Sequence, residues 1–232
     1  MRKADLDDLQ DVKTRAELLA ALSRVGESMG FSTSSMVLRT GSFFGKPSYT
    51  DVNNAPKEWV ELASNPALHA VDPVFYKLNT SREPFIYDQD FYARNGAADF
   101  WDMAAPYGFF NGVSASLMMG ADGLLFWGFD SEDGIAKDEA KRLRLVADTM
   151  LIGVYAASAA ERILAPPKPS LTERHLEILR LVKAGKSSSV IGQLIGISEN
   201  TVDFHVKRLC ALLGVASRHQ ALAKVLEMGM LT

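Results

Sequence analysis

The sequence predicts two domains: an N-terminal α+β domain, built as an α-β-α sandwich around an antiparallel sheet, and a C-terminal all-α four-helix bundle containing a helix-turn-helix. Residues 164–170, LAPPKPS, mark the boundary, because three prolines in seven residues make a stiff and extended linker. Strand-like runs mingle with helical ones before this linker, whereas only helical periodicity follows it. We therefore expect domains at residues 1–163 and 171–232.

The N-terminal elements follow from hydrophobic periodicity and turn residues. The clearest signal is a hairpin, GVSASLMMG (112–120) and GLLFWGFDS (123–131), around the turn residues Ala121, Asp122 and Gly123. An antiparallel hairpin among helices favours an α+β sandwich over a doubly wound parallel sheet. The other predicted elements are strands over 33–40, within 41–54 and over 85–88, and helices over 5–29, 56–64, 72–81, 89–106 and 138–163. The last of these helices carries a stripe at helical spacing made of Leu143, Ala147, Met150, Leu151, Val154 and Ser158.

Four helices are predicted beyond the linker. Gly196 separates two of them, and Ser198 is placed to cap the second by accepting from a backbone N–H of its first turn. Two helices joined by a glycine-containing turn, the second presenting basic groups, are typical of a helix-turn-helix that binds DNA. The four predicted helices cover residues 172–185, 186–195, 198–213 and 217–228. In the third, Val202, Val206, Leu209 and Leu213 form the apolar face and Asn200, Phe204, Lys207 and Arg208 the opposite one.

The charge distribution supports this assignment. Residues 168–232 hold nine Lys or Arg and five Asp or Glu, a net charge of +4, so residues 1–167 carry −7 of the total of −3. A basic module on an acidic body places a nucleic-acid surface at one end of the chain. The single cysteine, Cys210, excludes an internal disulfide framework and suits a reducing cytosol. With no apolar stretch of about eighteen residues and a polar N-terminus, we expect a cytoplasmic protein without a membrane partner.

Short motifs in the C-terminal part resemble the LuxR-type DNA-binding domain. They are LT-x-R-x-x-E-x-L at 171–179, GKS at 185–187, GIS-x-x-TV at 196–202, HV at 205–206, LGV at 213–215 and R-x-QA at 218–221. The same domain ends many two-component response regulators, but the acidic pair, strand-end Asp and later Lys of a phosphoacceptor domain are not found here.

The N-terminal part resembles the autoinducer-binding domain of quorum-sensing LuxR receptors. Pro56 and Trp59, followed by Asp72-Pro73-Val74 thirteen residues after the Trp, have the family's spacing. Tyr87 stands where the family often has Trp, and Gly108 and Gly112 fit its G-x-x-x-G before the hairpin.

This resemblance implies an N-acyl-homoserine lactone as the small-molecule effector, with no cofactor and no metal. Trp59 would donate its indole N–H to the lactone carbonyl, and Asp72 would accept from the ligand's amide N–H. Packing in an ordinary core for the aromatic residues, and a helix N-cap for Asp72, are the alternative roles. The residues that the resemblance assigns to the ligand pocket are Ala55, Trp59, Ala63, Asp72, Val74, Tyr87, Phe100, Trp101 and Ser114.

Two positions depart from the family. Ala55 and Ala63 stand where the family commonly has tyrosines, one of which normally helps to hold the acyl carbonyl. Their absence removes a hydrogen-bond donor and opens space. We therefore expect a bulky, branched or aromatic acyl group, or a ligand that is not an acyl-homoserine lactone.

On the DNA side, the resemblance assigns base reading to Asp203 and Lys207, with Phe204 between them. Lys207 would reach guanine, Asp203 would accept from cytosine, and Phe204 would meet a thymine methyl group. An acidic residue at a base-reading position is unusual and is expected to alter site choice. The residues expected at phosphates are Lys186, Ser187, Thr201, His205 and Arg208.

Together these features predict a ligand-responsive transcriptional regulator that binds a palindromic site as a homodimer and works with RNA polymerase. The expected dimer contacts are the helices 138–163 and 218–228. Two alternatives are an orphan regulator that needs no ligand or answers to a non-lactone molecule, and an enzyme fused to a DNA-binding domain. Against the enzyme stand the lack of a Cys/His cluster, of G-x-S-x-G and of a phosphate-binding glycine loop, and the isolation of His69.

Overall fold

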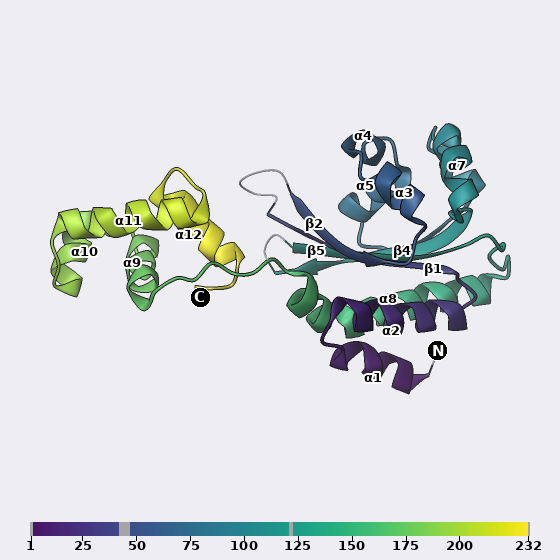
Figure 1. The fold of residues 1–232 in the computed structure, drawn as a ribbon, viewed down its shortest axis with the longest axis horizontal. Helices are drawn as coiled ribbons and strands as arrows, with labels where there is room; N and C mark the ends of the chain where they lie inside the picture. The colour runs from purple at the N-terminus through teal and green to yellow at the C-terminus, as the bar shows by residue number, and fades with distance from the viewer. Residues whose placement is uncertain (1, 42–46, 121–122, 232) are drawn as a thin grey trace. The chain divides into compact units, whose positions relative to one another are not determined.

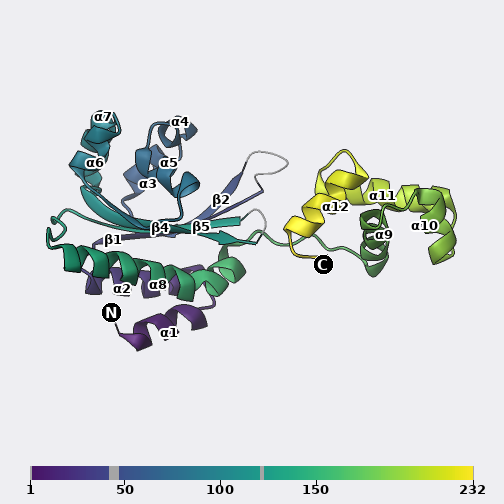
Figure 2. The same ribbon diagram turned by 180° about the vertical axis from the view of Figure 1, so that it is seen from behind.

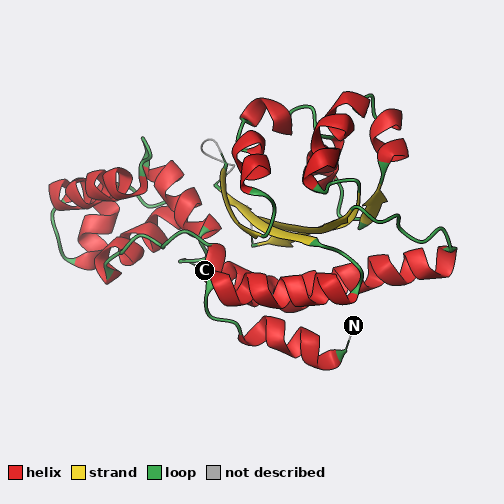
Figure 3. Cartoon of the chain, turned by 45° about the vertical axis from the view of Figure 1, so that its right-hand side comes forward, coloured by secondary structure: helices red, strands yellow, loops and turns green. Residues whose placement is uncertain are grey.

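The computed structural model describes residues 2–41, 47–120 and 123–231. The chain folds into two compact units, one built mainly from Met1–Thr40, Ser48–Met119 and Gly123–Ala165, the other mainly from Pro166–Thr232. The first is an α+β sandwich and the second is all-α, so the predicted fold class is confirmed (Figure 3).

An antiparallel sheet of order β2-β1-β5-β4-β3 forms the centre of the first unit. The predicted hairpin is present as β4 and β5, which pair from Asn111↔Ser131 to Met119↔Gly123; its turn residues Ala121 and Asp122 lie outside the described residues. The strands are β1 (Thr33–Thr40), β2 (Ser48–Asn53), β3 (Phe85–Tyr87), β4 (Asn111–Met119) and β5 (Gly123–Ser131).

Helices cover both faces of this sheet (Figures 1 and 2). On one face lie α1 (Lys3–Asp11), α2 (Arg15–Ser28) and α8 (Glu139–Leu164); on the other lie α3 (Lys57–Ala63), α4 (Pro66–His69), α5 (Pro73–Thr80), α6 (Gln89–Arg94) and α7 (Ala98–Ala104). Because side chains alternate along a strand, β5 contributes to both cores. Trp127 and Phe129 join the core with α2 and α8, whereas Leu124 and Phe126 join the core under the short helices.

Two predicted helices are each divided in the structure. The helix predicted over 5–29 breaks between α1 and α2, where the Thr14 side chain accepts from Glu17 N and the Glu17 carboxylate accepts from Lys13 N. These two hydrogen bonds start a new helix, and the periodicity alone did not reveal them. The helix predicted over 89–106 breaks at Gly96, whose φ of 70° ends α6 before α7 begins. A 3-10 turn, Ala105–Tyr107, follows α7.

The long helix α8 packs through its small residues rather than through the predicted stripe. Ile152, Gly153, Ala156, Ala159 and Ala160 are buried against the sheet side. Leu143, Leu151 and Val154 of the predicted stripe are instead 69%, 43% and 53% exposed. By length and composition α8 is apolar enough to cross a membrane, but its buried face belongs to the core of this unit.

The second unit contains α9 (Glu173–Lys183), α10 (Ser188–Ile195), α11 (Glu199–Leu213) and α12 (Arg218–Glu227). At the start of each helix, a side-chain hydroxyl accepts a hydrogen bond from a backbone N–H of the first turn. The capping residues are, in helix order, Thr172, Ser187, Ser198 and Ser217. Gly196 and Gly214 adopt left-handed conformations that end α10 and α11. The predicted face of α11 is buried at Val202, Leu209 and Leu213 and partly buried at Val206. The predicted helix-turn-helix is therefore present as α10 and α11.

Candidate functional site: a buried cavity and an exposed recognition helix

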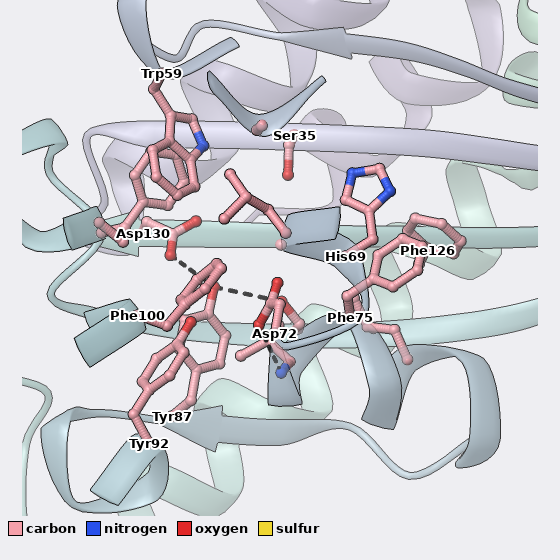
Figure 4. A pocket seen from close by; sticks show the side chains of 18 of the residues that line it. Ser35, Trp59, His69, Asp72, Phe75, Tyr87, Tyr92, Phe100, Phe126 and Asp130 are labelled. Carbon is pink, nitrogen blue, oxygen red and sulfur yellow. Dashed lines mark hydrogen bonds between the residues drawn. The ribbon is translucent and has the colours of Figure 1, made fainter. Parts of the chain in front are cut away.

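A cavity of about 180 Å³ lies between the sheet and the short helices of the first unit. Ligand cavities of proteins usually occupy about 300–1,000 Å³, so this one is small. Its wall is largely aromatic, and a few polar groups reach into it (Figure 4). The structure brings to this cavity the predicted residues Trp59, Ala63, Asp72, Val74, Tyr87, Phe100 and Ser114.

Trp59 lies on α3, which begins after Pro56. Its ring packs against Phe109 at a centroid distance of 4.8 Å and meets Phe100 edge-on at 6.2 Å. Among the described residues, none accepts a hydrogen bond from its indole N–H. Trp59 therefore offers the cavity a free donor held in place by aromatic packing.

Asp72 is the N-cap of α5, and its Oδ1 accepts from Val74 N at 2.8 Å. Pro73 at the first helical position suits this helix start. The residue as a whole is only half-buried, yet burial of its carboxyl group raises the pKa to about 6, partly offset by backbone hydrogen bonds from Val74 and Phe75. The capping role anticipated as an alternative is thus present, and the carboxyl group also lines the cavity.

A second carboxylate in the cavity, Asp130, was missed by the sequence analysis. It is 2% exposed, and the Tyr87 hydroxyl donates to its Oδ1 at 2.6 Å. Burial is the main cause that raises the pKa of Asp130 to about 7; the Tyr87 hydrogen bond acts against the shift and the charge of Asp72 adds to it. Burial likewise raises the pKa of Tyr87 well above its ordinary value. Side chains alternate along β5, so Asp130 shares a face with Phe126 and Gly128. This alternation could have identified Asp130 as a cavity residue from the sequence.

Other missed wall residues are aromatic. Tyr92 stacks on Phe100 at 5.7 Å, and His69 stacks on Phe75 at 4.6 Å. His69, which had no evident partner in the sequence, therefore forms part of the cavity wall. Short helices α4 and α6 supply His69 and Tyr92, and their tertiary position was not evident from the sequence.

Two predicted residues do not reach the cavity. The Trp101 indole N–H donates to the Phe110 carbonyl at 2.9 Å, and its ring packs on Phe110. Ala55 lies in the connection before α3, where its backbone N–H donates to Asn53. Ala63 does line the cavity, but the volume of about 180 Å³ does not support the enlarged pocket expected from the two alanines.

The outward face of α11 is the candidate DNA surface. Phe204 is 59% exposed, and Lys207 and Arg208 are exposed beside it. Lys186 is exposed at the start of the helix-turn-helix. Basic groups around an exposed aromatic side chain suit contacts with phosphates and base edges in a major groove.

Four other predicted DNA residues have partners within the second unit. Asp203 accepts from the Ser188 hydroxyl at 2.6 Å, so its carboxylate braces α11 against α10. The hydroxyls of Thr201 and Ser198 lie 2.8 Å apart, and the Ser187 hydroxyl caps α10. His205 packs against His175 with ring centroids 5.7 Å apart, and burial lowers the pKa of His175. Asp203 and Ser187 are exposed, whereas Thr201 and His205 are partly buried.

Across residues 2–41, 47–120 and 123–231, no group of three or more His, Cys, Asp or Glu side chains is arranged to hold a metal ion.

Comparison with known proteins agrees with both halves of this arrangement. The family model described as "Autoinducer binding domain" matches residues 14–160, and that of "Bacterial regulatory proteins, luxR family" matches residues 169–225. The regulatory protein SdiA of Escherichia coli is 26% identical over 224 residues, covering 94% of this chain and 92% of its own. The quorum sensing-dependent transcriptional regulator RpaR of Rhodopseudomonas palustris is 30% identical over 233 residues, covering 95% and 92%.

A solved structure agrees as well. SdiA in complex with octanoyl-rac-glycerol has a TM-score of 0.79 and 25% identity, covering 96% of this chain and 92% of that one. The relatives are transcriptional regulators, which overturns the enzyme alternative. The chain belongs to the LuxR family of quorum-sensing transcriptional regulators, with an autoinducer-binding domain followed by a helix-turn-helix DNA-binding domain.

Proposed function

We propose that this regulator is a cytoplasmic homodimer that binds an N-acyl-homoserine lactone, or a related acylated molecule, in the cavity and a palindromic DNA site through α11. The main observation behind this proposal is that the free indole N–H of Trp59 and the buried carboxyl group of Asp72 face the same aromatic cavity. A donor and an acceptor of this kind suit the carbonyl and the amide N–H of an acyl amide. In this proposal residues 1–163 bind the ligand and form the dimer, residues 164–170 link the two domains, and residues 171–232 bind DNA.

The ligand acts through the packing of the N-terminal core. An empty cavity weakens that core, and a ligand that binds only the folded state stabilises it by mass action. The small cavity favours a short acyl chain over the bulky one expected from Ala55 and Ala63. Octanoyl-rac-glycerol, which SdiA holds in its complex, makes a non-lactone amphiphile the second candidate ligand.

The exposed stripe of α8 supports dimerisation. Leu143, Leu151 and Val154 recur at helical spacing and are exposed, although they are large apolar residues. A second copy packed on this stripe, with a further contact near α12, would set two recognition helices about one turn of DNA apart. Such a dimer would contact RNA polymerase from its promoter site.

Asp72→Asn is expected to lower the affinity for N-hexanoyl-homoserine lactone about ten- to a hundredfold, or about 1.5–3 kcal/mol, because a charge-assisted hydrogen bond is lost. Asparagine still caps α5, so the fold is preserved. Isothermal titration calorimetry on the full chain measures the effect. The matched control is Asp88→Asn, which changes the N-cap of α6 outside the cavity wall. Equal affinities of the wild type and Asp72→Asn would remove Asp72 from the ligand site.

Lys207→Ala is expected to weaken DNA binding by about 1–3 kcal/mol, with the loss concentrated at one base position. Its exposed ammonium group lies on the outward face of α11. Sites are first selected from random DNA, and fluorescence anisotropy then compares single-base variants of the selected site. Lys183→Ala, which removes an exposed lysine at the end of α9, is the control. A loss that is equal on every sequence would show a phosphate contact instead.

The ligand-independent alternative makes a different prediction. The full chain would then be recovered in soluble form without any additive, and it would bind its selected DNA site equally well with and without a lactone. A ligand-dependent gain in either property supports the proposal.

A further inference from the structure

The cavity contains one more buried carboxylate than the ligand contacts proposed above use. Asp130 projects from β5, the middle strand of the sheet, at a position where its neighbours on the same face are Phe126 and Gly128. Gly128 contributes no side chain, and the Ser114 side chain of the adjacent strand β4 occupies that place. The residue is 2% exposed and lines the same cavity as Asp72 and Trp59 (Figure 4).

The protein only half satisfies this carboxylate. Tyr87 donates to Oδ1 at 2.6 Å, and the Ser114 hydroxyl lies 3.5 Å from the Tyr87 hydroxyl. No described residue donates to Oδ2. The other titratable wall residues that face the cavity are Asp72, Tyr92 and His69, and none of them forms an ion pair with Asp130. Because Asp130 lines the cavity, a bound ligand can supply a donor to this oxygen.

Asp130 is joined through Tyr87 to a chain of aromatic wall residues. Tyr87 packs edge-on against Tyr92 at 6.3 Å, Tyr92 stacks on Phe100, and Phe100 meets Trp59. The charge of Asp72 also acts on Asp130. Both carboxylates line the cavity and can meet the polar head of a bound molecule, whereas Phe75, Phe126 and Leu78 offer apolar wall for a tail.

We infer that the preferred ligand is an acyl amide whose head group carries a second hydrogen-bond donor, a hydroxyl or an ammonium group, which Asp130 accepts through Oδ2. This inference rests on the proposed function and specifies its head group. A homoserine lactone offers its amide N–H as a single donor and would leave Asp130 unsatisfied. A site built to accept a hydrogen bond discriminates strongly against an analogue without the donor.

The test compares matched hexanoyl compounds by calorimetry on the full wild-type chain. Hexanoyl ethanolamide carries the second donor as a hydroxyl, its O-methyl ether lacks that donor, and hexanoyl ethylenediamine carries an ammonium group. We expect the hydroxyl or ammonium compound to bind about ten- to a hundredfold more tightly than the ether. In Asp130→Ala the donor compounds and the ether are expected to bind with about equal affinity. The control Glu132→Gln, at an exposed residue, is expected to keep the preference for the donor compounds. The comparison within the wild type does not depend on the folding of any variant.

A fourth compound, N-hexanoyl-homoserine lactone, separates this inference from the proposed function. If the lactone binds, and the ether binds as tightly as the hydroxyl and ammonium compounds, the ligand needs no second donor. The inference is then refuted and the lactone assignment stands. If a donor compound binds more tightly than the ether and the lactone does not bind, the inference stands and the lactone assignment falls. If none of the four compounds binds, both fall. A preference of the hydroxyl over the ammonium compound, or the reverse, identifies the donor.

Discussion

Asp130→Asn is expected to remove most of the pH dependence of the stability of the N-terminal unit between pH 5 and pH 8. Burial raises the pKa of Asp130 to about 7 from an ordinary value of 3.8, so the folded state binds this proton more tightly than the unfolded chain does. The proton contributes stability that is fully present below pH 4 and is lost as the pH rises through 7. The full contribution is about 4 kcal/mol, and more than half of it remains at pH 5.

The measurement is urea unfolding of wild type and variant at several pH values. Tryptophan fluorescence reports on this unit alone, because Trp59, Trp101 and Trp127 all lie within it. Wild type should be more stable at pH 5 than at pH 8, and Asp130 should account for about 2–3 kcal/mol of this difference. Asp72, whose pKa is raised to about 6, adds a smaller dependence of the same sign that survives in the variant.

Asp133→Asn serves as the control, because this exposed carboxylate lies three residues further along the chain. It should leave the pH profile of the wild type unchanged. A wild-type profile that is flat, or that rises towards pH 8, would contradict the burial of a protonated Asp130.

Gly153→Leu is expected to destabilise the N-terminal unit by about 3 kcal/mol or more. A side chain at position 153 would overlap the indole ring of Trp127, which is 1% exposed. The ring has little freedom to move aside, because its N–H donates to the Thr149 carbonyl of the same helix at 2.8 Å. Leucine favours a helix over glycine by only about 1 kcal/mol, so the overlap dominates.

Urea unfolding followed by tryptophan fluorescence measures this loss, which is large beside a typical domain stability of about 5–15 kcal/mol. Ala20→Leu is the control, since it adds bulk at an exposed position of α2, a helix that packs beside α8. Its effect on the free energy of unfolding should stay within about 0.5 kcal/mol. If both variants unfold at the same urea concentration, α8 does not pack on Trp127 through Gly153.

The local sequence was sufficient where short-range chemistry determines the structure. Ser198, Gly196 and the apolar spacing of Val202, Leu209 and Leu213 act within one or two helical turns, so the helix-turn-helix followed from them. The β4–β5 hairpin was equally local. Periodicity did not locate the helix breaks at Thr14 and Gly96, because a cap or a left-handed glycine interrupts a helix without changing its apolar pattern.

Tertiary structure decided which faces are buried and which polar groups meet. The larger side chains of α8 predicted the face that packs on the sheet. The face with small residues around Gly153 packs there instead, because the Trp127 ring lies directly against Gly153. In the sequence, Asp130 is a polar residue at the end of a predicted strand. In the structure it lines the cavity, where Tyr87 of β3 hydrogen-bonds to it and Asp72 at the start of α5 lines the same wall. The sequence by itself determined the two-domain regulator and its helix-turn-helix. The chemistry of the ligand site depends on contacts between residues more than forty positions apart, and only the folded chain brings these residues together.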